Sequence, residues 1–146
     1  MEANWKNKIE IGISKTTANP PVWTYATLCE GVEGMDFAEN EQNQQFFFMC
    51  GKGFASNLVT GCAPEIVITG KRIPGNAAQE FVAGLQFKLG EERETSVKIT
   101  SGGKLITADA SVGAITSFGG QTLDVNQFGC TLRFNGEPTV STAPAQ

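Results

Sequence analysis

The sequence predicts a mainly β fold: two packed antiparallel sheets, in a sandwich or barrel-like arrangement, with one flanking α-helix. Three observations lead to this fold class. Several segments alternate apolar and polar residues with a period of two, which is typical of half-buried strands. One segment alone has the three- and four-residue spacing of an amphipathic helix. The chain has 146 residues, so residues 1–146 are predicted to form a single domain with its own core.

The N-terminal part is predicted to form strands on both sides of a proline break. "NKIEIGIS" sets Ile9, Ile11 and Ile13 against Lys8 and Glu10, the pattern of a strand with one buried face. "KTTANPP" interrupts that strand, because prolines cannot donate to a strand ladder. "VWTYATLCEGVEG" is again rich in β-forming residues and ends in glycine.

Strand patterns return in the middle and at the end of the chain. "PEIVITGKRI" places Ile66 and Ile68 on one face, and "TSVKITSG" does the same with Val97 and Ile99. "KLITADASVGAITSFGG" and "DVNQFGCTLRF" alternate in the same way. The last segment, 135–146, reads "NGEPTVSTAPAQ" and has no core pattern, so it is predicted to be a C-terminal tail.

The single helix is predicted within "PGNAAQEFVAGLQFKLGEE", where the apolar stripe consists of Ala78, Phe81, Val82, Leu85 and Leu89. Asn76 is placed to cap its start, Gln79 occupies the position of a capping-box partner, and Gly90 can end it. Gly84 weakens a helix by about 1 kcal/mol relative to alanine, so the helix needs docking to be stable. Phe81 and Leu85 are predicted to dock it on the sheet.

The composition excludes several classes of function. The chain has no histidine, which removes Ser-His-Asp and Cys-His catalysis and the commonest metal ligand. Its formal charge is -4 with scattered lysines and arginines, which disfavours tight binding to a nucleic-acid backbone. No apolar stretch reaches membrane-spanning length, so no membrane role is expected. The four cysteines form no C-x-x-C pair and are expected to be reduced and mostly buried.

Motifs that suggest chemistry are weak on inspection. "TGKR" and "SGGK" lack the spaced glycine and the following Ser or Thr of a phosphate-binding loop, and are better interpreted as turns. "GEERE" follows the end of the predicted helix, where solvated charge is ordinary. "EGVEGMDFAENE" lacks the ligand pattern of a calcium loop. Trp5, Trp23 and Tyr25 suit a sugar-binding platform less well than anchors or core. We therefore expect no catalytic residues, no metal and no cofactor.

The stretch "ENEQNQQFFFMCG", residues 39–51, does not fit a half-buried strand. A polar run continues directly into Phe46, Phe47, Phe48 and Met49 without alternation. Either both faces of this segment are covered inside the monomer, or another chain covers one of them. The residues alone leave both explanations open.

Three segments from the middle to the end of the chain carry a family resemblance. "QFGCTLRFNGEPTV", preceded by "GAITSFGG" and "TGKRIPGNAAQEFV", resembles the major tail proteins, or tail tube proteins, of long-tailed bacteriophages of Gram-positive hosts. The resemblance extends from about residue 23 to residue 140, and it is best over 66–87 and 94–140. It consists of positional similarities along most of the chain rather than of a catalytic fingerprint.

The resemblance implies a structural role in the virion tail, after assembly in the host cytoplasm. Family members form hexameric rings that stack around a tape-measure protein, and the resulting tube carries DNA during ejection without binding it specifically. Tail terminator and baseplate or tail-tip proteins are the implied partners at the ends of the tube. The alternative is a small β-sandwich binding or decoration module of a virion.

The resemblance also implies roles for particular residues. The family places a long loop between early strands, and here residues 34–54 occupy that position as an assembly loop. Phe46, Phe47, Phe48 and Met49 would then make the contacts between subunits or rings. The wall of the lumen should be polar, and the candidates that face it are Thr107, Asp109, Ser111 and, more weakly, Gln127.

Overall fold

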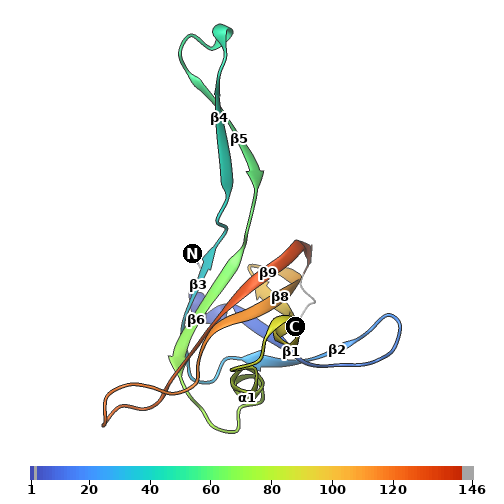
Figure 1. Cartoon of the computed structure of the whole chain (residues 1–146), viewed down its shortest axis with the longest axis vertical. Coiled ribbons are helices and arrows are strands. Elements are labelled where there is room, and N and C mark those ends of the chain that lie inside the picture. Colours follow the sequence, from blue (N-terminus) through green and yellow to red (C-terminus); the bar gives the residue numbers. More distant parts are fainter. Residues whose placement is uncertain (2, 143–146) are drawn as a thin grey trace.

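The computed structural model describes residue 1 and residues 3–142. Seven strands form one antiparallel sheet in the order β2-β1-β7-β8-β9-β6-β3, and two further strands, β4 and β5, form a separate hairpin (Figure 1). The strands are β1 (Lys8–Lys15), β2 (Trp23–Leu28), β3 (Val32–Ala38), β4 (Gln42–Phe47), β5 (Ala55–Gly61), β6 (Glu65–Lys71), β7 (Glu94–Ser101), β8 (Lys104–Thr116) and β9 (Gln127–Thr142). The α-helix is α1 (Ala77–Gly84), and the short 3-10 turns are η1 (Asn4–Lys6), η2 (Met49–Gly51) and η3 (Gly90–Arg93). The predicted fold class, mainly β and antiparallel with one helix, is confirmed.

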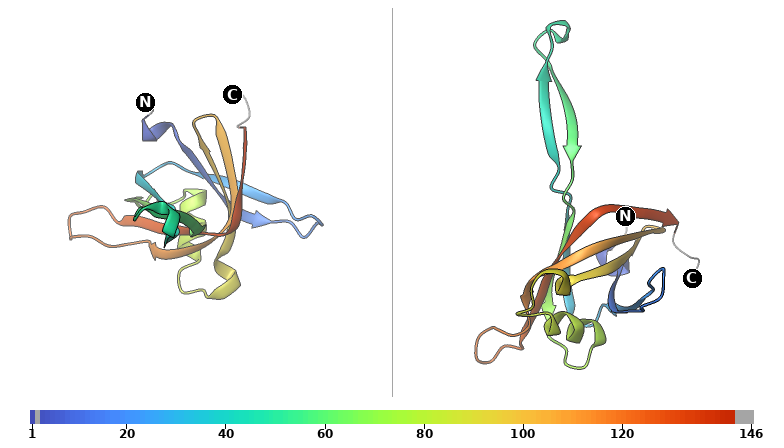
Figure 2. Two further views of the ribbon diagram at one scale, coloured as in Figure 1. Left: turned by 90° about the horizontal axis from the view of Figure 1, so that it is seen from above. Right: turned by 45° about the vertical axis from the view of Figure 1, so that its right-hand side comes forward.

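The large sheet is strongly curled. Strands β2 and β3 follow each other in the sequence, yet they lie at opposite edges of the sheet. Seven strands laid flat would separate the two edges by roughly 29 Å, whereas the connection from Leu28 to Val32 spans at most about 14 Å. The sheet must therefore bend until its edges come close (Figure 2). The edges are not hydrogen-bonded to each other, and we call the gap between β2 and β3 the seam.

The core lies inside this curl. One cluster joins side chains from both halves of the sheet and from the helix: Ile9, Ile11, Leu28, Ile66, Ile68, Ala78, Val82, Leu85, Val97, Ile99, Ala110, Val112, Phe128, Cys130 and Leu132. The alternating residues predicted for β1, β6 and β7 belong to it, except that Ile13 is half-buried and packs against it. The two layers that face each other across the core are thus the two halves of one sheet, and the second sheet is the projecting hairpin.

The helix begins as predicted and ends earlier. The Asn76 side chain accepts a hydrogen bond from the Gln79 backbone N–H at 3.2 Å, which caps the first turn. The helix stops at Gly84 rather than at Gly90, and Leu89 is 83% exposed instead of completing the apolar stripe. Leu85 is buried in the core and Phe81 packs against it half-buried, where α1 contacts β1, β2 and β8.

The prediction of a C-terminal tail over residues 135–146 is wrong for residues 135–142. Residues 135–142 continue β9 and pair with the first half of β8, with Thr139 opposite Thr107 and Val140 opposite Ile106. A ladder of backbone hydrogen bonds needs a neighbouring strand but no apolar alternation, so the composition of this segment gave no strand signal. Residues 143–146 lie outside the described residues.

The expectation that the cysteines are mostly buried is also wrong. All four are free, but only Cys130 is buried, whereas Cys29, Cys50 and Cys62 are exposed. Burial raises the pKa of the Cys130 thiol to about 12, so this side chain behaves as a small hydrophobe. Over residues 1 and 3–142, no helix is both long and apolar enough to span a membrane.

Candidate assembly surfaces

The β4–β5 hairpin projects far beyond the body of the molecule (Figures 1 and 2). It continues the pair formed by β3 and β6: Ala38 lies opposite Glu65, and the Ala63 N–H donates to the Glu39 carbonyl at 3.0 Å. Beyond that point only β4 and β5 pair with each other, and η2 closes the turn. The predicted assembly loop, residues 34–54, therefore has different bounds: residues 34–38 belong to β3, and the projection continues to Gly61.

The apolar residues at the end of this hairpin are exposed. Phe46, Phe47, Phe48 and Met49 expose 39%, 68%, 60% and 102% of their surface, and we call these four residues the hairpin tip. The rings of Phe46 and Phe48 stack with centroids 6.0 Å apart. The explanation by a two-sided buried strand inside the monomer is therefore wrong. Contiguous exposed apolar side chains of this size usually mark an interaction surface.

The hairpin is nearly free of charge. From Gln42 to Gly61 the sequence contains a single charged residue, Lys52, although 18% of the whole chain is charged. A hairpin that stayed in water would gain solubility from charged side chains on both faces. Depletion of charge is instead the composition found at the centre of protein interfaces.

A second candidate surface is the sheet face opposite the core. Thr107, Asp109 and Ser111 alternate on β8 with the buried Ala108 and Ala110, so the three predicted residues do share one outer face. Asp109 is exposed, whereas the other two are half-buried. The Asn135 side-chain amide donates to Ser111 Oγ at 2.9 Å and extends this polar face onto β9.

Gln127, the fourth predicted residue of this surface, lies apart from the other three. It begins β9 and pairs with Lys71 on β6, whereas Ser111 pairs with Arg133 further along β9. Gln127 and Arg133 are six positions apart on the strand, or roughly 20 Å. The structure therefore brings together Thr107, Asp109 and Ser111 but not Gln127.

Residues of neighbouring strands belong to the same polar face, and sequence reasoning missed them. On β7, Lys98, Ser96 and Glu94 lie opposite Thr107, Asp109 and Ser111, respectively. The Tyr25 hydroxyl shares a 2.9 Å hydrogen bond with Ser96 Oγ, and the Lys98 ammonium lies 4.3 Å from the Tyr25 ring centroid. Alternation within each strand was readable from the sequence, but the order of strands in the sheet was not.

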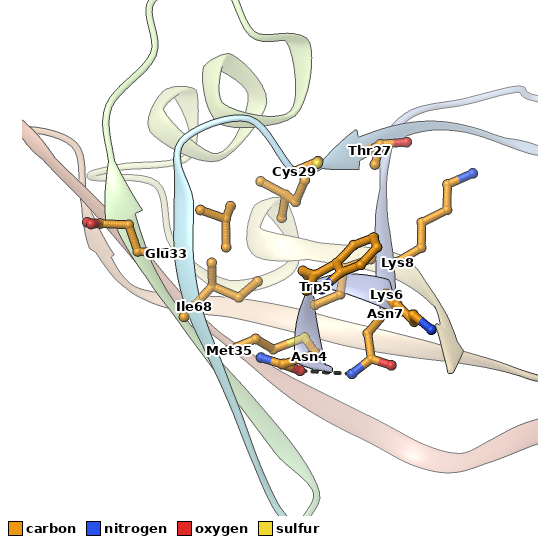
Figure 3. Close-up of a pocket in the computed structure, with 14 residues that line it drawn as sticks. Asn4, Trp5, Lys6, Asn7, Lys8, Thr27, Cys29, Glu33, Met35 and Ile68 are labelled. Carbon is orange, nitrogen blue, oxygen red and sulfur yellow. Dashed lines mark hydrogen bonds between the residues drawn. The ribbon is translucent and has the colours of Figure 1, made fainter. Parts of the chain in front are cut away.

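A hollow of about 500 Å³ opens at the seam (Figure 3). Leu28 of β2 and Val32 and Met35 of β3 line it from the two edges, and Ile68 of β6 lies behind them. The 3-10 turn η1 places Trp5 over the hollow, and this ring is 81% exposed. We call this hollow the seam pocket. Its volume lies within the range of about 300–1,000 Å³ that is typical of binding pockets.

Among the described residues, no three His, Cys, Asp or Glu side chains lie close enough together to hold a metal ion. Asp109 and Glu94 share the polar face, but Lys98 and Arg133 lie among them. The three surfaces thus differ in character: the hairpin tip is apolar, the seam pocket has an apolar floor, and the sheet face is polar.

Comparison with known proteins gives similarity in structure but not in sequence. No protein-family model matches the chain, and no curated protein sequence matches it. A chain in the structure "Tail of empty GTA particle computed with helical refinement, C6 symmetry" superposes with a TM-score of 0.74 at 10% identity, covering 97% of this chain and 100% of that chain. A chain in "Virion of native gene transfer agent (GTA) particle" gives a TM-score of 0.70 at 8% identity, with coverage of 97% and 100%. This chain therefore shares its whole fold with chains of those particles.

Proposed function

We propose that this protein is the structural subunit of a phage tail tube, which forms hexameric rings that stack into the conduit for DNA. Its place would be the virion tail, reached after assembly in the host cytoplasm. The observation that carries the proposal is the hairpin: an uncharged projection with an exposed aromatic tip on a body whose fold is found in the tail of a phage-like particle. A solitary soluble monomer has no use for such a projection.

The sheet edges support ring formation. Strands β2 and β3 have unpaired outer edges in the described part of the chain, and such edges tend to pair with another chain. A closed ring of identical subunits satisfies every edge in the same way. The symmetry named for the similar tail structure, C6, is the symmetry we propose for the ring.

The polar face supports a lumen. We propose that Thr107, Asp109 and Ser111 face the passage. The residues opposite them on β7 are Lys98, Ser96 and Glu94, so the face has no basic stripe. Each contact between a phosphate and a cation adds affinity, so a wall without a basic stripe lets DNA slide. The same wall would surround a tape-measure protein before ejection, and terminator and baseplate or tail-tip proteins would close the ends. The role is structural and not enzymatic, and it requires no cofactor and no membrane.

The hairpin tip provides the direct test. Replacing Phe46, Phe47 and Phe48 by serine should leave the free energy of unfolding nearly unchanged, because these side chains lie outside the core. Polymerisation, followed by light scattering and negative-stain microscopy, should be lost, since burying each phenylalanine is worth roughly 1.5–3 kcal/mol. The matched triple replacement by leucine keeps apolar surface and should still polymerise.

Two results would contradict the proposal. One is a wild-type protein that stays monomeric at every concentration, which would favour a binding or decoration module. The other is a serine variant that assembles as well as the wild type. Hydrogen exchange adds a second readout: an isolated two-stranded hairpin is marginally stable, so amides of β4 should exchange fast in the free subunit and slowly in the tube.

A further inference from the structure

We propose that the seam pocket of one subunit receives the hairpin tip of a subunit in the neighbouring ring. The inference rests on the proposed function and names the surface that accepts the tip. The partner is a second copy of this chain. Within one subunit the hairpin points away from the body, so its tip cannot reach its own pocket (Figure 1).

The length of the hairpin decides how far the tip reaches. From residue 39 to residue 50 the projection contains twelve residues of mostly extended chain, or about 40 Å. The thirteen residues of β8, which cross the body, span about 43 Å by the same rise. The hairpin is thus about as long as the body is high.

Stacked rings form a closed tube wall only if the hairpin of one subunit lies alongside the body of a subunit in the next ring. If the tip touched the near end of the neighbour, the bodies of successive rings would stand one hairpin length apart and the wall would be open. When the bodies meet, the tip must instead reach the far end of the neighbour's body. That end is where its own hairpin leaves the body, and the N-terminal segment lies there (Figure 1). The seam pocket begins at that segment and extends from there to residues 27–29 and 32–35, beside the connection between β2 and β3.

The chemistry of tip and pocket also matches. The tip offers Phe46 and Phe48 as one stacked pair, with Phe47 and Met49 beside them. The pocket offers an apolar floor, with Leu28, Met35 and Ile68, and an exposed indole at its mouth, while polar residues of the N-terminal segment line the rest of it. Aromatic side chains that enter a pocket and meet an aromatic on the partner are the usual energetic centre of an interface.

An alternative acceptor exists and makes the inference testable. The connection between β8 and β9 also exposes apolar side chains, namely Phe118, Leu123 and Val125. It lies at the end of the body opposite the hairpin tip (Figure 1). End-to-end stacking would place the tip on this connection, whereas overlapping stacking places it in the seam pocket.

Native cysteines allow the two arrangements to be distinguished. Cys50 is exposed directly after the tip, and Cys29 is exposed and lines the seam pocket. In a Cys62→Ser background, tubes treated with a short bifunctional maleimide should give crosslinks between Cys50 and Cys29 of different chains. Tubes formed by a Cys29→Ser variant should give no such crosslinks. The same treatment of dilute monomer should give none.

Side-chain variants provide a second readout. Trp5→Ala should raise the critical concentration for polymerisation about 10-fold or more, and Trp5→Phe should restore most of the loss. The Trp5 ring is exposed in the free subunit, so neither change should shift its unfolding midpoint. Leu123→Ser should leave the critical concentration unchanged.

The inference is overturned if tubes form but Cys50 links to a cysteine introduced by Thr122→Cys and not to Cys29. A loss of polymerisation in Leu123→Ser with none in Trp5→Ala overturns it as well. A different result would contradict the proposed function itself, namely a wild-type chain that forms no rings or tubes. That result would overturn both the proposed function and the inference about the seam pocket.

Discussion

Gly70 packs directly against the backbone of Gly31, and neither position has room for a Cβ atom. A Cβ on Gly70 would overlap the Gly31 carbonyl oxygen and lie 2.8 Å from Val32 Cα. A Cβ on Gly31 would lie 2.5 Å from the Lys71 carbonyl oxygen, and Gly31 has a φ of +81°, which favours glycine. The close approach lets the Lys71 N–H donate to the Gly31 carbonyl at 2.7 Å. The short connection across the seam is thereby fixed to β6.

Gly70→Ala should therefore destabilise the subunit. The added methyl meets backbone atoms, which cannot rotate away, so we expect a loss of about 1–3 kcal/mol in the free energy of unfolding measured with urea. Gly84→Ala is the matched control, because a Cβ there meets nothing within 4 Å at the last residue of α1. It should be neutral or slightly stabilising. Equal losses in both variants would contradict the role of the close approach.

Truncating single side chains to alanine should show that Leu85 contributes more to stability than Phe81. Leu85 is buried in the core, so Leu85→Ala should cost about 2–5 kcal/mol in the free energy of unfolding. Phe81 is only half-buried, and Phe81→Ala should cost less. Leu89→Ala is the control at an exposed position and should have little effect. An effect of Leu89→Ala as large as that of Leu85→Ala would mean that the helix continues beyond Gly84.

Glu80 should make stability depend on pH. Its carboxylate accepts hydrogen bonds from the Gly75 N–H at 3.0 Å and from Arg72 Nη2 at 2.9 Å. First the Gly75 hydrogen bond and then Arg72 lower the pKa of Glu80 from its ordinary value of 4.5. A lowered pKa means that the contribution to stability is complete above that value and is lost as the pH falls through the folded-state pKa.

Glu80→Gln isolates this contribution, because glutamine keeps an acceptor but loses the charge. At neutral pH the variant should unfold at a lower urea concentration than the wild type. The difference should shrink as the pH falls below 4.5 and the wild-type carboxyl becomes protonated. A difference that stays constant from neutral to acid pH would assign the effect to packing rather than to charge.

Asp109→Lys tests the polar face. The side chain is exposed, so the subunit should fold and assemble normally. If the face lines the lumen, the new cation adds a phosphate contact in every subunit, and tubes should retain nuclease-protected DNA that high salt releases. Glu91→Lys in η3 is the matched change of charge elsewhere on the body. Bound DNA that nuclease still digests would place Asp109 on the outer wall.

Local signals predicted most of the elements. Alternation located β1, β6 and β7, and Asn76 marked the start of the helix. The helix end was misplaced because Leu89 continues the apolar spacing, although the buried surface near the sheet ends at Leu85. The spacing of apolar residues along the chain does not indicate where the sheet surface that the helix packs on ends.

The candidate assembly surfaces were predictable only in part. The run from Phe46 to Met49 was recognisable as anomalous because it lacks alternation, and charge depletion up to Gly61 would have extended the segment to its full length. The seam pocket left no signal, because its walls come from Trp5, Leu28 and Met35 on three separate elements. Only the curl of the sheet brings them together.

The order of strands in the sheet also determines which part of the subunit folds first. The β4–β5 hairpin is local in sequence and can form within about 1–10 μs. The sheet needs distant pairings such as Ile9 with Ile99, which take milliseconds to seconds in folds of this kind. A newly made subunit thus exposes its hairpin tip before the strands that form its seam pocket have paired. In the proposed assembly, an incompletely folded chain can attach to a growing tube but cannot receive the next subunit. Such a chain would act as a cap, and a small fraction of misfolded subunits would lower the average length of the tubes.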